Sequence, residues 1–248
     1  MMSPNDFFMA IVSELKYLRL KNKVSVISRI ETSEMISNGK LSMSRFGDGE
    51  LGIILNSEGI GFQKWDELLS SRLEEVLRNS EKIPILICIP DVFSGTHNMK
   101  KNPSLYWKKW MADNGMRLGK YLNSNIKYGD SLITRLYLPW TNTKDEDKII
   151  NNIKKSWQGK KVTIVEGKQT RWGVGNHLLD GALSIKRILC PSENAWLVYD
   201  KIINACEELK SETDVYILAL GPTATVLAYD LALGGGNCTG FRSFGFAI

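Results

Sequence analysis

The feature of this sequence that most restricts its fold is a regular alternation of apolar runs and helical patterns between residues 145 and 233. Short apolar runs predict buried strands, and apolar side chains three or four positions apart predict helices. Strands that alternate with helices at this spacing form a parallel sheet with right-handed crossovers, so we predict a Rossmann-like α/β fold with a mostly parallel sheet flanked by helices. The predicted strands are 161–165, 185–189 and 215–220, and the predicted helices are 145–157, 176–182, 195–209 and 223–233.

The first part of the chain supplies further elements of the same kind. Residues 83–90 are a near-continuous apolar run bounded by prolines, as in a strand that is buried on both faces. Near the N-terminus, Phe7, Ile11 and Leu18 follow a helical spacing, which predicts a helical segment within residues 1–38 and suits a homodimer contact. Strands are also predicted at 41–46 and 131–138, and helices at 65–79 and 105–122.

Size, charge and cysteine content limit the function classes. The 248 residues, 43% of them hydrophobic, suffice for one large α/β domain. The net charge of +5 is spread along the chain, which suits a small polyanionic ligand and argues against a nucleic-acid binder. The four cysteines form no C-x-x-C pair, and the chain has neither a signal-peptide pattern nor an apolar run of about 18 residues. We therefore expect reduced thiols, no transmembrane segment and a cytoplasmic location.

The stretch Ser44-Arg45-Phe46-Gly47-Asp48-Gly49-Glu50 includes the end of the strand predicted at 41–46. In a helix the carboxylates of Asp48 and Glu50 would point about 200° apart, whereas a glycine-hinged turn lets both face one point. We therefore predict a turn in which these two acids share a hard divalent cation. The alternative is a surface turn with two solvated acids.

A second candidate loop comes after the strand predicted at 161–165. Glu166 lies directly after this strand, and three glycines and two cations precede the predicted helix. Backbone N–H groups and a helix dipole in such a loop bind phosphate, while the alternative is an ordinary turn that needs glycine for its backbone angles. The residues that we expect near a phosphate are Lys168, Thr170, Arg171, Gly173, Gly175 and Asn176.

Two further loops join predicted strands to predicted helices. Gly221 and Thr223 lie at a helix start, where the threonine hydroxyl caps the helix or contacts a phosphate, capping being favoured. Asn194 either caps the next helix or reads a nucleobase edge, and capping is again favoured. His97 and His177 are isolated in the sequence, so a Ser/His/Asp hydrolase has little support.

Four motifs, in this order, resemble the GT-D type glycosyltransferases, a family first catalogued as a bacterial domain of unknown function. The resemblance runs from residue 39 to residue 235, so we expect one glycosyltransferase domain over 1–248, with 39–235 as its family-like core. The motifs are Ser44-Arg-Phe-Gly-Asp-Gly-Glu50, Val165-Glu-Gly-x-x-Thr-Arg-x-Gly-Val-Gly-Asn176, Pro191-x-x-Asn-Ala195 and Leu218-Ala-Leu-Gly-Pro-Thr-Ala-Thr-Val-Leu-Ala-Tyr-Asp-Leu231.

The resemblance implies transfer of a sugar, usually glucose, from a UDP-sugar to a glycan on a bacterial surface glycoprotein or polysaccharide, with Mn²⁺ or Mg²⁺ as the cofactor. The family's D-x-E metal motif falls on Asp48 and Glu50, which makes these two residues candidates for metal binding and catalysis. Glu166 is a candidate base for the acceptor hydroxyl. Candidates for the diphosphate are Arg45, Arg135, Lys168 and Arg171, because arginine in particular suits bidentate phosphate contacts.

Residues 236–248 depart from the pattern that the resemblance implies. Family members continue with a strand similar to Ala-Leu-Asp-x-Gly-His-x-Asp, whereas this chain reads Gly236-Asn-Cys-Thr-Gly-Phe-Arg-Ser-Phe-Gly-Phe-Ala-Ile248. Codons permitted for residues 238–247, read one nucleotide out of frame, can encode a sequence close to the family's. We therefore hypothesise a frameshift that removed an Asp/His pair. A second departure is His177, which stands where the family commonly has an acid.

Two rival functions are compatible with these observations. With an altered tail, the chain could be a catalytically impaired protein that binds a nucleotide sugar without turnover. The glycine-containing strand-to-helix loops alone also fit another Rossmann-like phosphate-binding transferase, such as a phosphotransferase.

Overall fold

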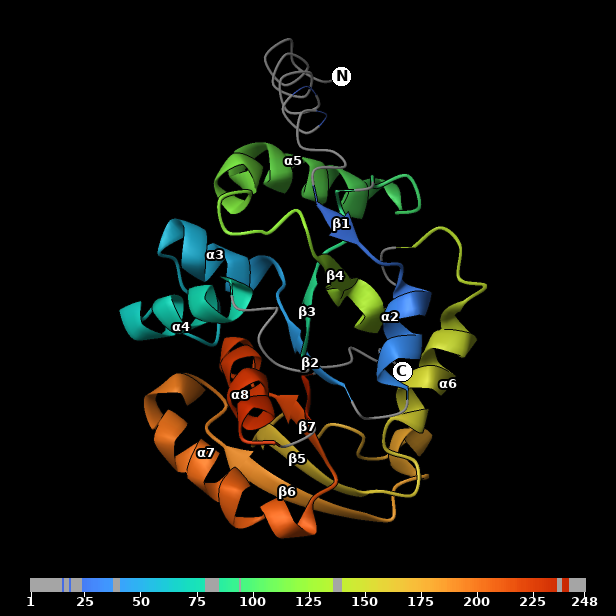
Figure 1. Cartoon of the computed structure of the whole chain (residues 1–248), viewed down its shortest axis with the longest axis vertical. Coiled ribbons are helices and arrows are strands. Elements are labelled where there is room, and N and C mark those ends of the chain that lie inside the picture. Colours follow the sequence, from blue (N-terminus) through green and yellow to red (C-terminus); the bar gives the residue numbers. More distant parts are fainter. Residues whose placement is uncertain are drawn as a thin grey trace.

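The computed structural model of the chain contains one eight-stranded sheet in which every described strand pair is parallel (Figure 1). It describes residues 15, 18, 24–37, 41–78, 85–93, 95–135, 140–235 and 238–240. The predicted parallel α/β fold is confirmed. The strand order is β1-β4-β3-β2-β8-β7-β5-β6. The strands are β1 (Ser25–Val26), β2 (Ser42–Arg45), β3 (Ile85–Ile89), β4 (Lys127–Asp130), β5 (Lys161–Gly167), β6 (Ser184–Cys190), β7 (Val215–Ala219) and β8 (Cys238–Gly240).

Helices cover both faces of the sheet. In Figure 1, α2 and α6 lie on one side of it, and α3, α4, α7 and α8 lie on the other. The α-helices are α2 (Arg29–Ile36), α3 (Asp48–Asn56), α4 (Glu67–Arg78), α5 (Lys101–Leu118), α6 (Glu146–Lys155), α7 (Tyr199–Glu208) and α8 (Pro222–Leu233). The 3₁₀ helices are η1 (Ser131–Thr134), η2 (His177–Leu179), η3 (Ala195–Val198) and η4 (Lys210–Glu212).

Strand β3 shows why the core has two layers. All five of its residues are buried, and successive side chains point to opposite faces of the sheet. Ile85, Ile87 and Ile89 belong to the cluster that also contains core residues of α3, α4, α7 and α8, whereas Leu86 and Cys88 belong to the cluster that contains residues of α2 and α6. A central strand of a parallel sheet must be apolar on both faces, which explains the continuous apolar run in the sequence.

Three predicted elements differ from the structure. The strand predicted at 131–138 is wrong over residues 131–134, because the strand ends at Asp130 and the Asp130 carboxylate accepts a hydrogen bond from the Leu132 backbone N–H (2.8 Å), which starts η1; residues 136–138 lie outside the described residues. The helix predicted at 176–182 is reduced to the three residues of η2. Helix α5 begins four residues before its predicted start, because proline is tolerated in a first helical turn and Pro103 lies there.

Strand β8 comes from the segment that departs from the family pattern. It lies between β2 and β7, with Met43 paired to Thr239 and Ile217 also paired to Thr239. Strand pairing uses backbone groups, so a segment of altered sequence can still supply a strand. Residues 236, 237 and 241–248, and most of the predicted N-terminal helical segment, lie outside the described residues.

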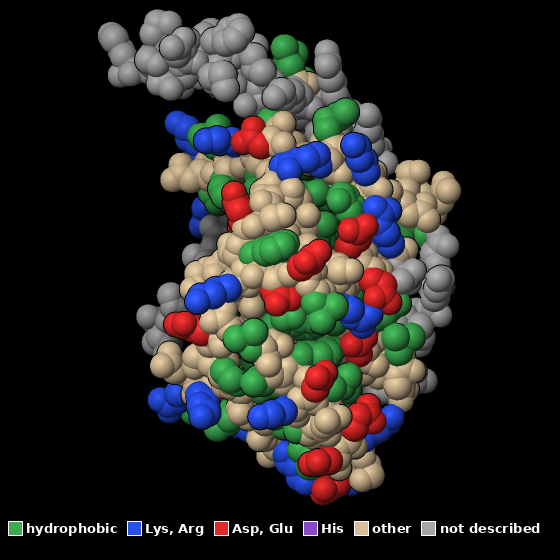
Figure 2. All heavy atoms as spheres, turned by 90° about the vertical axis from the view of Figure 1, so that its left-hand side faces the viewer, with side chains coloured by type: hydrophobic (Ala, Val, Ile, Leu, Met, Phe, Trp, Pro, Cys, Tyr) green, Lys and Arg blue, Asp and Glu red, His purple; other side chains and the backbone are tan. Residues whose placement is uncertain are grey.

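The surface agrees with the mild charge excess. On the face that Figure 2 shows, Lys and Arg side chains are interspersed with Asp and Glu and do not form one continuous basic patch. Among the described helices, none is long and apolar enough to cross a membrane.

Candidate functional site

A cavity of about 630 Å³ opens where several strands end at the same edge of the sheet. Parallel sheets place ligand sites at the carboxyl ends of their strands, and this cavity is lined by residues that come after β2, β5, β6 and β7. We call it the donor cavity, after the nucleotide-sugar donor that the resemblance implies. Its lining residues are Asp48, Gly49, Ile60, Phe62, Gln63, Arg135, Gly167, Gln169, Thr170, Pro191, Ser192, Asn194, Ala195, Ala219, Leu220 and Gly221.

A second cavity of about 460 Å³ adjoins the donor cavity. Asp48 and Arg135 line both cavities and therefore form part of the wall between them. We call it the side cavity. Its lining residues are Arg45, Gly47, Asp48, Asn102, Pro103, Tyr106, Trp107, Ser131, Leu132 and Arg135.

Asp48 and Glu50 lie in the first turn of helix α3, so the predicted glycine-hinged turn is wrong. The half-buried Asp48 reaches both cavities, and its carboxylate accepts a hydrogen bond from the Tyr106 hydroxyl (2.7 Å). Glu50 is fully buried and lines neither cavity, because its carboxylate turns back to accept a hydrogen bond from the Gly47 N–H (2.7 Å). Glu50 stands at N3 and makes one half of a capping box, because the N-cap residue Gly47 has no side chain to return a bond; this contact holds Asp48 at the helix start.

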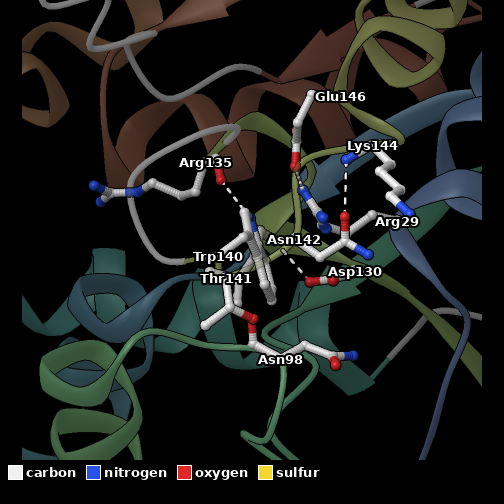
Figure 3. Close-up of polar contacts among 10 residues, drawn as sticks. Arg29, Asn98, Asp130, Arg135, Trp140, Thr141, Asn142, Lys144 and Glu146 are labelled. Atoms are coloured by element: carbon white, nitrogen blue, oxygen red, sulfur yellow. Dashed lines mark hydrogen bonds and ion pairs between the residues drawn. The ribbon is translucent and has the colours of Figure 1, made fainter.

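Arg135 supplies a cation to the wall between the cavities, as predicted for a diphosphate contact, although it lies after η1 and not in a strand. Its backbone carbonyl accepts a hydrogen bond from Trp140 Nε1 (2.6 Å). The guanidinium of Arg29 lies 3.9 Å from the centre of the Trp140 ring and pairs with Glu146 at 2.7 Å (Figure 3). The contacts from Glu146 to Arg29, from Arg29 to Trp140 and from Trp140 to the Arg135 carbonyl hold the backbone of Arg135 in place.

Arg45 is buried and lines the side cavity, not the donor cavity. Its guanidinium donates to the carbonyl oxygen of Ser131, with Nε at 3.0 Å. The predicted phosphate contact is therefore not supported by its placement. The same strand is tied to α8, because the Thr225 hydroxyl donates to the Arg45 carbonyl (2.8 Å) and the Ser44 hydroxyl donates to the Thr225 carbonyl (2.8 Å).

Glu166 is buried near the end of β5 and lines neither cavity. One carboxylate oxygen accepts a hydrogen bond from the Trp172 N–H (2.6 Å), and the other pairs with the guanidinium of Arg187 on β6. Arg187 also donates to the Trp172 carbonyl (2.9 Å). Both oxygens thus hold the loop after β5, which argues against the predicted role of Glu166 as a base.

Only the first part of the glycine-containing loop reaches the donor cavity. Gly167, Gln169 and Thr170 line it, which agrees with the prediction for Thr170. The loop then turns outward, with positive φ at Arg171 (46°), and it leads only into the short η2. Five residues predicted to contact a phosphate line neither cavity: Lys168, Arg171, Gly173, Gly175 and Asn176. The side-chain oxygen of Asn176 instead caps η2 by accepting a hydrogen bond from the Leu178 N–H (3.0 Å).

Asn194 lines the donor cavity but does not cap η3, because it adopts a left-handed conformation with φ of 51°. Its side-chain oxygen accepts a hydrogen bond from the Lys64 N–H (2.8 Å), and its own N–H donates to the Phe62 carbonyl (2.8 Å). These bonds hold residues 60–64 against the cavity. The prediction that Asn194 caps a helix is therefore wrong. Asn194 instead holds the turn at residues 60–64 in place through these two hydrogen bonds.

Helix α8 points its N-terminus toward the donor cavity through Gly221. Gly221 has a positive φ of 56°, and a Cβ atom there would overlap the Phe62 ring, so glycine is required. Thr223 is fully buried behind the cavity wall, does not line it and does not cap the helix, so both predicted roles for its hydroxyl lack support.

Asp130 is a further acid at the end of a strand. Burial, together with the nearby negative charge of Asp91, raises the pKa of its carboxyl group to about 7. The carboxylate accepts hydrogen bonds from the backbone N–H groups of Leu132 (2.8 Å) and Asp91 (3.3 Å). It therefore organises the backbone that leads to Arg135.

Comparison with known families identifies the kind of protein. The family model for the glycosyltransferase GT-D fold matches residues 43–238. The chain belongs to the GT-D glycosyltransferases. The resemblance noted in the four motifs is thereby confirmed, and the matched range contains the loops that line both cavities.

Relatives and solved structures agree with this GT-D assignment. The chain is 36% identical over 213 residues to a probable glycosyl transferase, Gly, of Streptococcus gordonii (85% of the chain, 30% of the relative). It is 33% identical over 207 residues to the glycosyltransferase GlyD of Streptococcus pneumoniae (81% of the chain, 24% of the relative). The chain thus spans less than a third of either curated relative.

Two solved structures share the fold over most of their length. One, described as domain of unknown function 1792 with a distinct glycosyltransferase fold, superposes with a TM-score of 0.84 at 31% identity, covering 94% of this chain and 82% of that one. Another, a glycosyltransferase of the same domain from Streptococcus sanguinis, gives a TM-score of 0.83 at 33% identity, covering 87% and 80%.

A divalent ion implied by the GT-D family fits part of this site. Across the ranges that the structure describes, no group of three His, Cys, Asp or Glu side chains is arranged to hold a metal. Mg²⁺-type sites that bind phosphates use one or two protein carboxylates together with substrate oxygens and water. Asp48, whose carboxylate is at the cavity wall, fits the role of that carboxylate, and Glu50 supports it from behind.

Sequence reasoning missed several residues that line the two cavities or support the loops around them. Ile60, Phe62 and Gln63 lie in a turn whose only sequence signal is glycine at 59 and 61. Tyr106 and Trp107 lie in the helix predicted at 105–122, and the sequence does not link that helix to the site, because their position depends on how α5 crosses the sheet edge. Arg187 carried no local signal, since its partner Glu166 lies 21 residues away.

Proposed function

We propose that this GT-D protein transfers a hexose from a nucleoside diphosphate sugar, with UDP-glucose as the expected donor, to a glycan acceptor. The observation that carries the proposal is the donor cavity, which combines the carboxylate of Asp48, the cation of Arg135 and the N-terminus of α8 at one sheet edge. Its volume of about 630 Å³ lies in the range of small-molecule sites.

The lining residues divide the cavity by chemistry. Arg135 and the positive end of the α8 dipole suit a diphosphate, since both compensate negative charge. Phe62, Pro191 and Leu220 supply apolar surface, and Gln169, Ser192 and Asn194 supply polar groups. This second set suits a nucleoside, which presents a flat base and hydroxyl groups.

A bound Mn²⁺ or Mg²⁺ ion, held by Asp48, would neutralise charge that develops on the leaving diphosphate. Asp48 is kept in place for this role by the Tyr106 hydroxyl and by the hydrogen bond from the Gly47 N–H to Glu50. Arg135 contributes a second, permanent positive charge to the same wall.

The acceptor and the location are further parts of the proposal. The two streptococcal relatives are named as glycosyltransferases, and the resemblance implies acceptors on surface glycoproteins or polysaccharides. Nucleotide sugars as donors suit a cytoplasmic reaction.

Titration of UDP by calorimetry, with and without Mn²⁺, and then an assay of UDP release from several UDP-sugars, tests this function. Metal-dependent UDP binding with UDP release upon turnover is the expected result. Binding without release would favour the impaired nucleotide-sugar-binding protein, which the atypical residues 236–248 suggested. Absence of UDP binding would overturn the proposal.

A further inference from the structure

The side cavity has no role in the function proposed so far. Of the residues that the structure describes, Asp48 and Arg135 line both cavities, and these are the two residues at which the charged part of a donor would lie. A group-transfer enzyme needs room for a second reactant next to the reacting carbon, outside the space that the leaving group fills. The side cavity is placed for that reactant.

The apolar part of its wall comes from the start of α5. Tyr106 and Trp107 stand edge to face with ring centres 5.4 Å apart, and Pro103 lies one turn earlier. Trp107 is buried in the core, while 47% of Tyr106 is exposed. A pyranose ring has apolar C–H faces that pack on aromatic side chains.

The polar part of the wall contains an unused hydrogen-bonding group. The hydroxyl of Ser131 is buried, and among the described residues it has no hydrogen-bond partner. A buried hydroxyl in that state costs free energy, which a ligand hydroxyl can recover. Asn102 and Asp48 add an amide and a carboxylate to the same wall, and together these groups suit the hydroxyls of a sugar.

We propose that the side cavity binds the pyranose ring of the acceptor saccharide. The proposal rests on the proposed function, because it takes the donor cavity as the site of the nucleotide sugar. In the transfer, an acceptor hydroxyl oxygen forms a bond to the anomeric carbon of the donor. The bond from that carbon to the diphosphate oxygen breaks with its electron pair on UDP, and the hydroxyl proton passes to water.

The test measures binding of three methyl glycosides, those of glucose, galactose and N-acetylglucosamine, by saturation-transfer NMR on the whole chain. The measurement is made with saturating UDP and Mn²⁺, so that the donor cavity is filled. We expect at least one glycoside to bind. The double variant Asn102→Ala/Ser131→Ala should weaken that binding roughly tenfold, as expected for loss of one or two hydrogen bonds, with UDP affinity changed by less than about twofold.

Asn151→Ala/Ser211→Ala is the matched control, because both residues are exposed and line neither cavity. It should leave glycoside binding unchanged. If no glycoside binds, or if the double variant binds it as well as the natural chain, the acceptor site is refuted.

A donor analogue separates the two possible sources of a sugar in the side cavity. UDP-2-deoxy-2-fluoroglucose transfers its sugar slowly, so it can be added together with the glycoside. Displacement of the glycoside by this analogue, but not by UDP, would assign the side cavity to the donor's own sugar and overturn the proposal. Failure of UDP to bind, with glycoside binding intact, would contradict the proposed function and leave the saccharide site standing.

Discussion

Two acids that stand next to glycine near strand ends, Asp48 and Glu166, are used differently by the fold. After β2, Asp48 lies on the wall of both cavities. Near the end of β5, Glu166 is buried, accepts a hydrogen bond from the Trp172 N–H and pairs with Arg187. The first acid faces the two cavities, and the second holds a loop.

The path of the chain after each acid explains the difference. Helix α3 begins at Asp48, so the chain turns at once and leaves that side chain at the sheet edge. Glu166 is still inside β5, and its side chain points into the protein where β6 supplies a cation. An acid near a strand end is therefore a site residue only if the chain leaves the sheet at that residue.

The largest effect is expected from Asp48→Asn. Loss of the carboxylate at the cavity wall should weaken Mn²⁺-dependent UDP binding at least about a hundredfold, close to 3 kcal/mol. Calorimetric titration measures this, and thermal unfolding verifies the fold. Glu58→Gln, at an exposed acid that lines neither cavity, is the control. Near-natural affinity in Asp48→Asn would remove this residue from the donor site.

Arg187→Leu should mainly affect stability. It leaves the Glu166 carboxylate buried without its cation, which we expect to cost roughly 2–3 kcal/mol in denaturant unfolding, less than for a fully buried pair because Arg187 is partly exposed. The double variant Glu166→Gln/Arg187→Leu should recover part of the loss. If Glu166 were the base, Glu166→Gln would instead abolish transfer and leave the free energy of unfolding unchanged. That result would contradict the conclusion that Glu166 only holds a loop.

Asp130 offers a third strand-end acid, which is buried like Glu166. Its folded-state pKa of about 7 lies above the unfolded value of 3.8, so the protonated form is favoured in the folded chain. The contribution of this group to stability is fully present below pH 4 and is lost as the pH rises toward 7. Asp130→Asn should flatten that decline and raise stability at pH 8 by about 1–2 kcal/mol, measured by urea unfolding at several pH values. A decline as steep as in the natural chain would contradict the raised pKa.

Glu50→Gln should have the smallest effect. Glutamine can still accept the hydrogen bond from the Gly47 N–H, so we expect about 1 kcal/mol or less in stability and about a tenfold loss of metal-dependent UDP affinity. A loss equal to that of Asp48→Asn would show that Glu50 turns to the metal itself and would restore the two-carboxylate prediction.

The regular strands and helices were predictable, because in these segments the pattern of apolar residues in the sequence matches the side chains that are buried in the fold. The apolar run of β3 and the helical periods of α4 and α6 appear directly in the sequence, and the structure places them as expected. The strand predicted at 131–138 failed because the Asp130 carboxylate caps η1, a contact that apolar periodicity does not reveal.

The site was only partly predictable for a related reason. Loops after β5, β6 and β7 do meet at one cavity, because parallel strands end at a common edge. Which side chains of those loops face it depends on contacts between distant residues, such as Asn194 with Lys64 and Glu166 with Arg187. The pattern of a single sequence shows which loops follow the strands, but it does not show which distant residues contact each other.

The position of β8 bears on how the chain folds. Met43 and Thr239 are neighbours in the sheet although nearly 200 residues separate them, and β8 lies between β2 and β7. Pairings of such long sequence separation form late, because their loop-closure entropy is large. Until β8 pairs, β2 presents an open strand edge, which is a place for misassembly. Asp48 belongs to one half of the sheet and Gly167 and Gly221 to the other, so the donor cavity is completed only in the same late step.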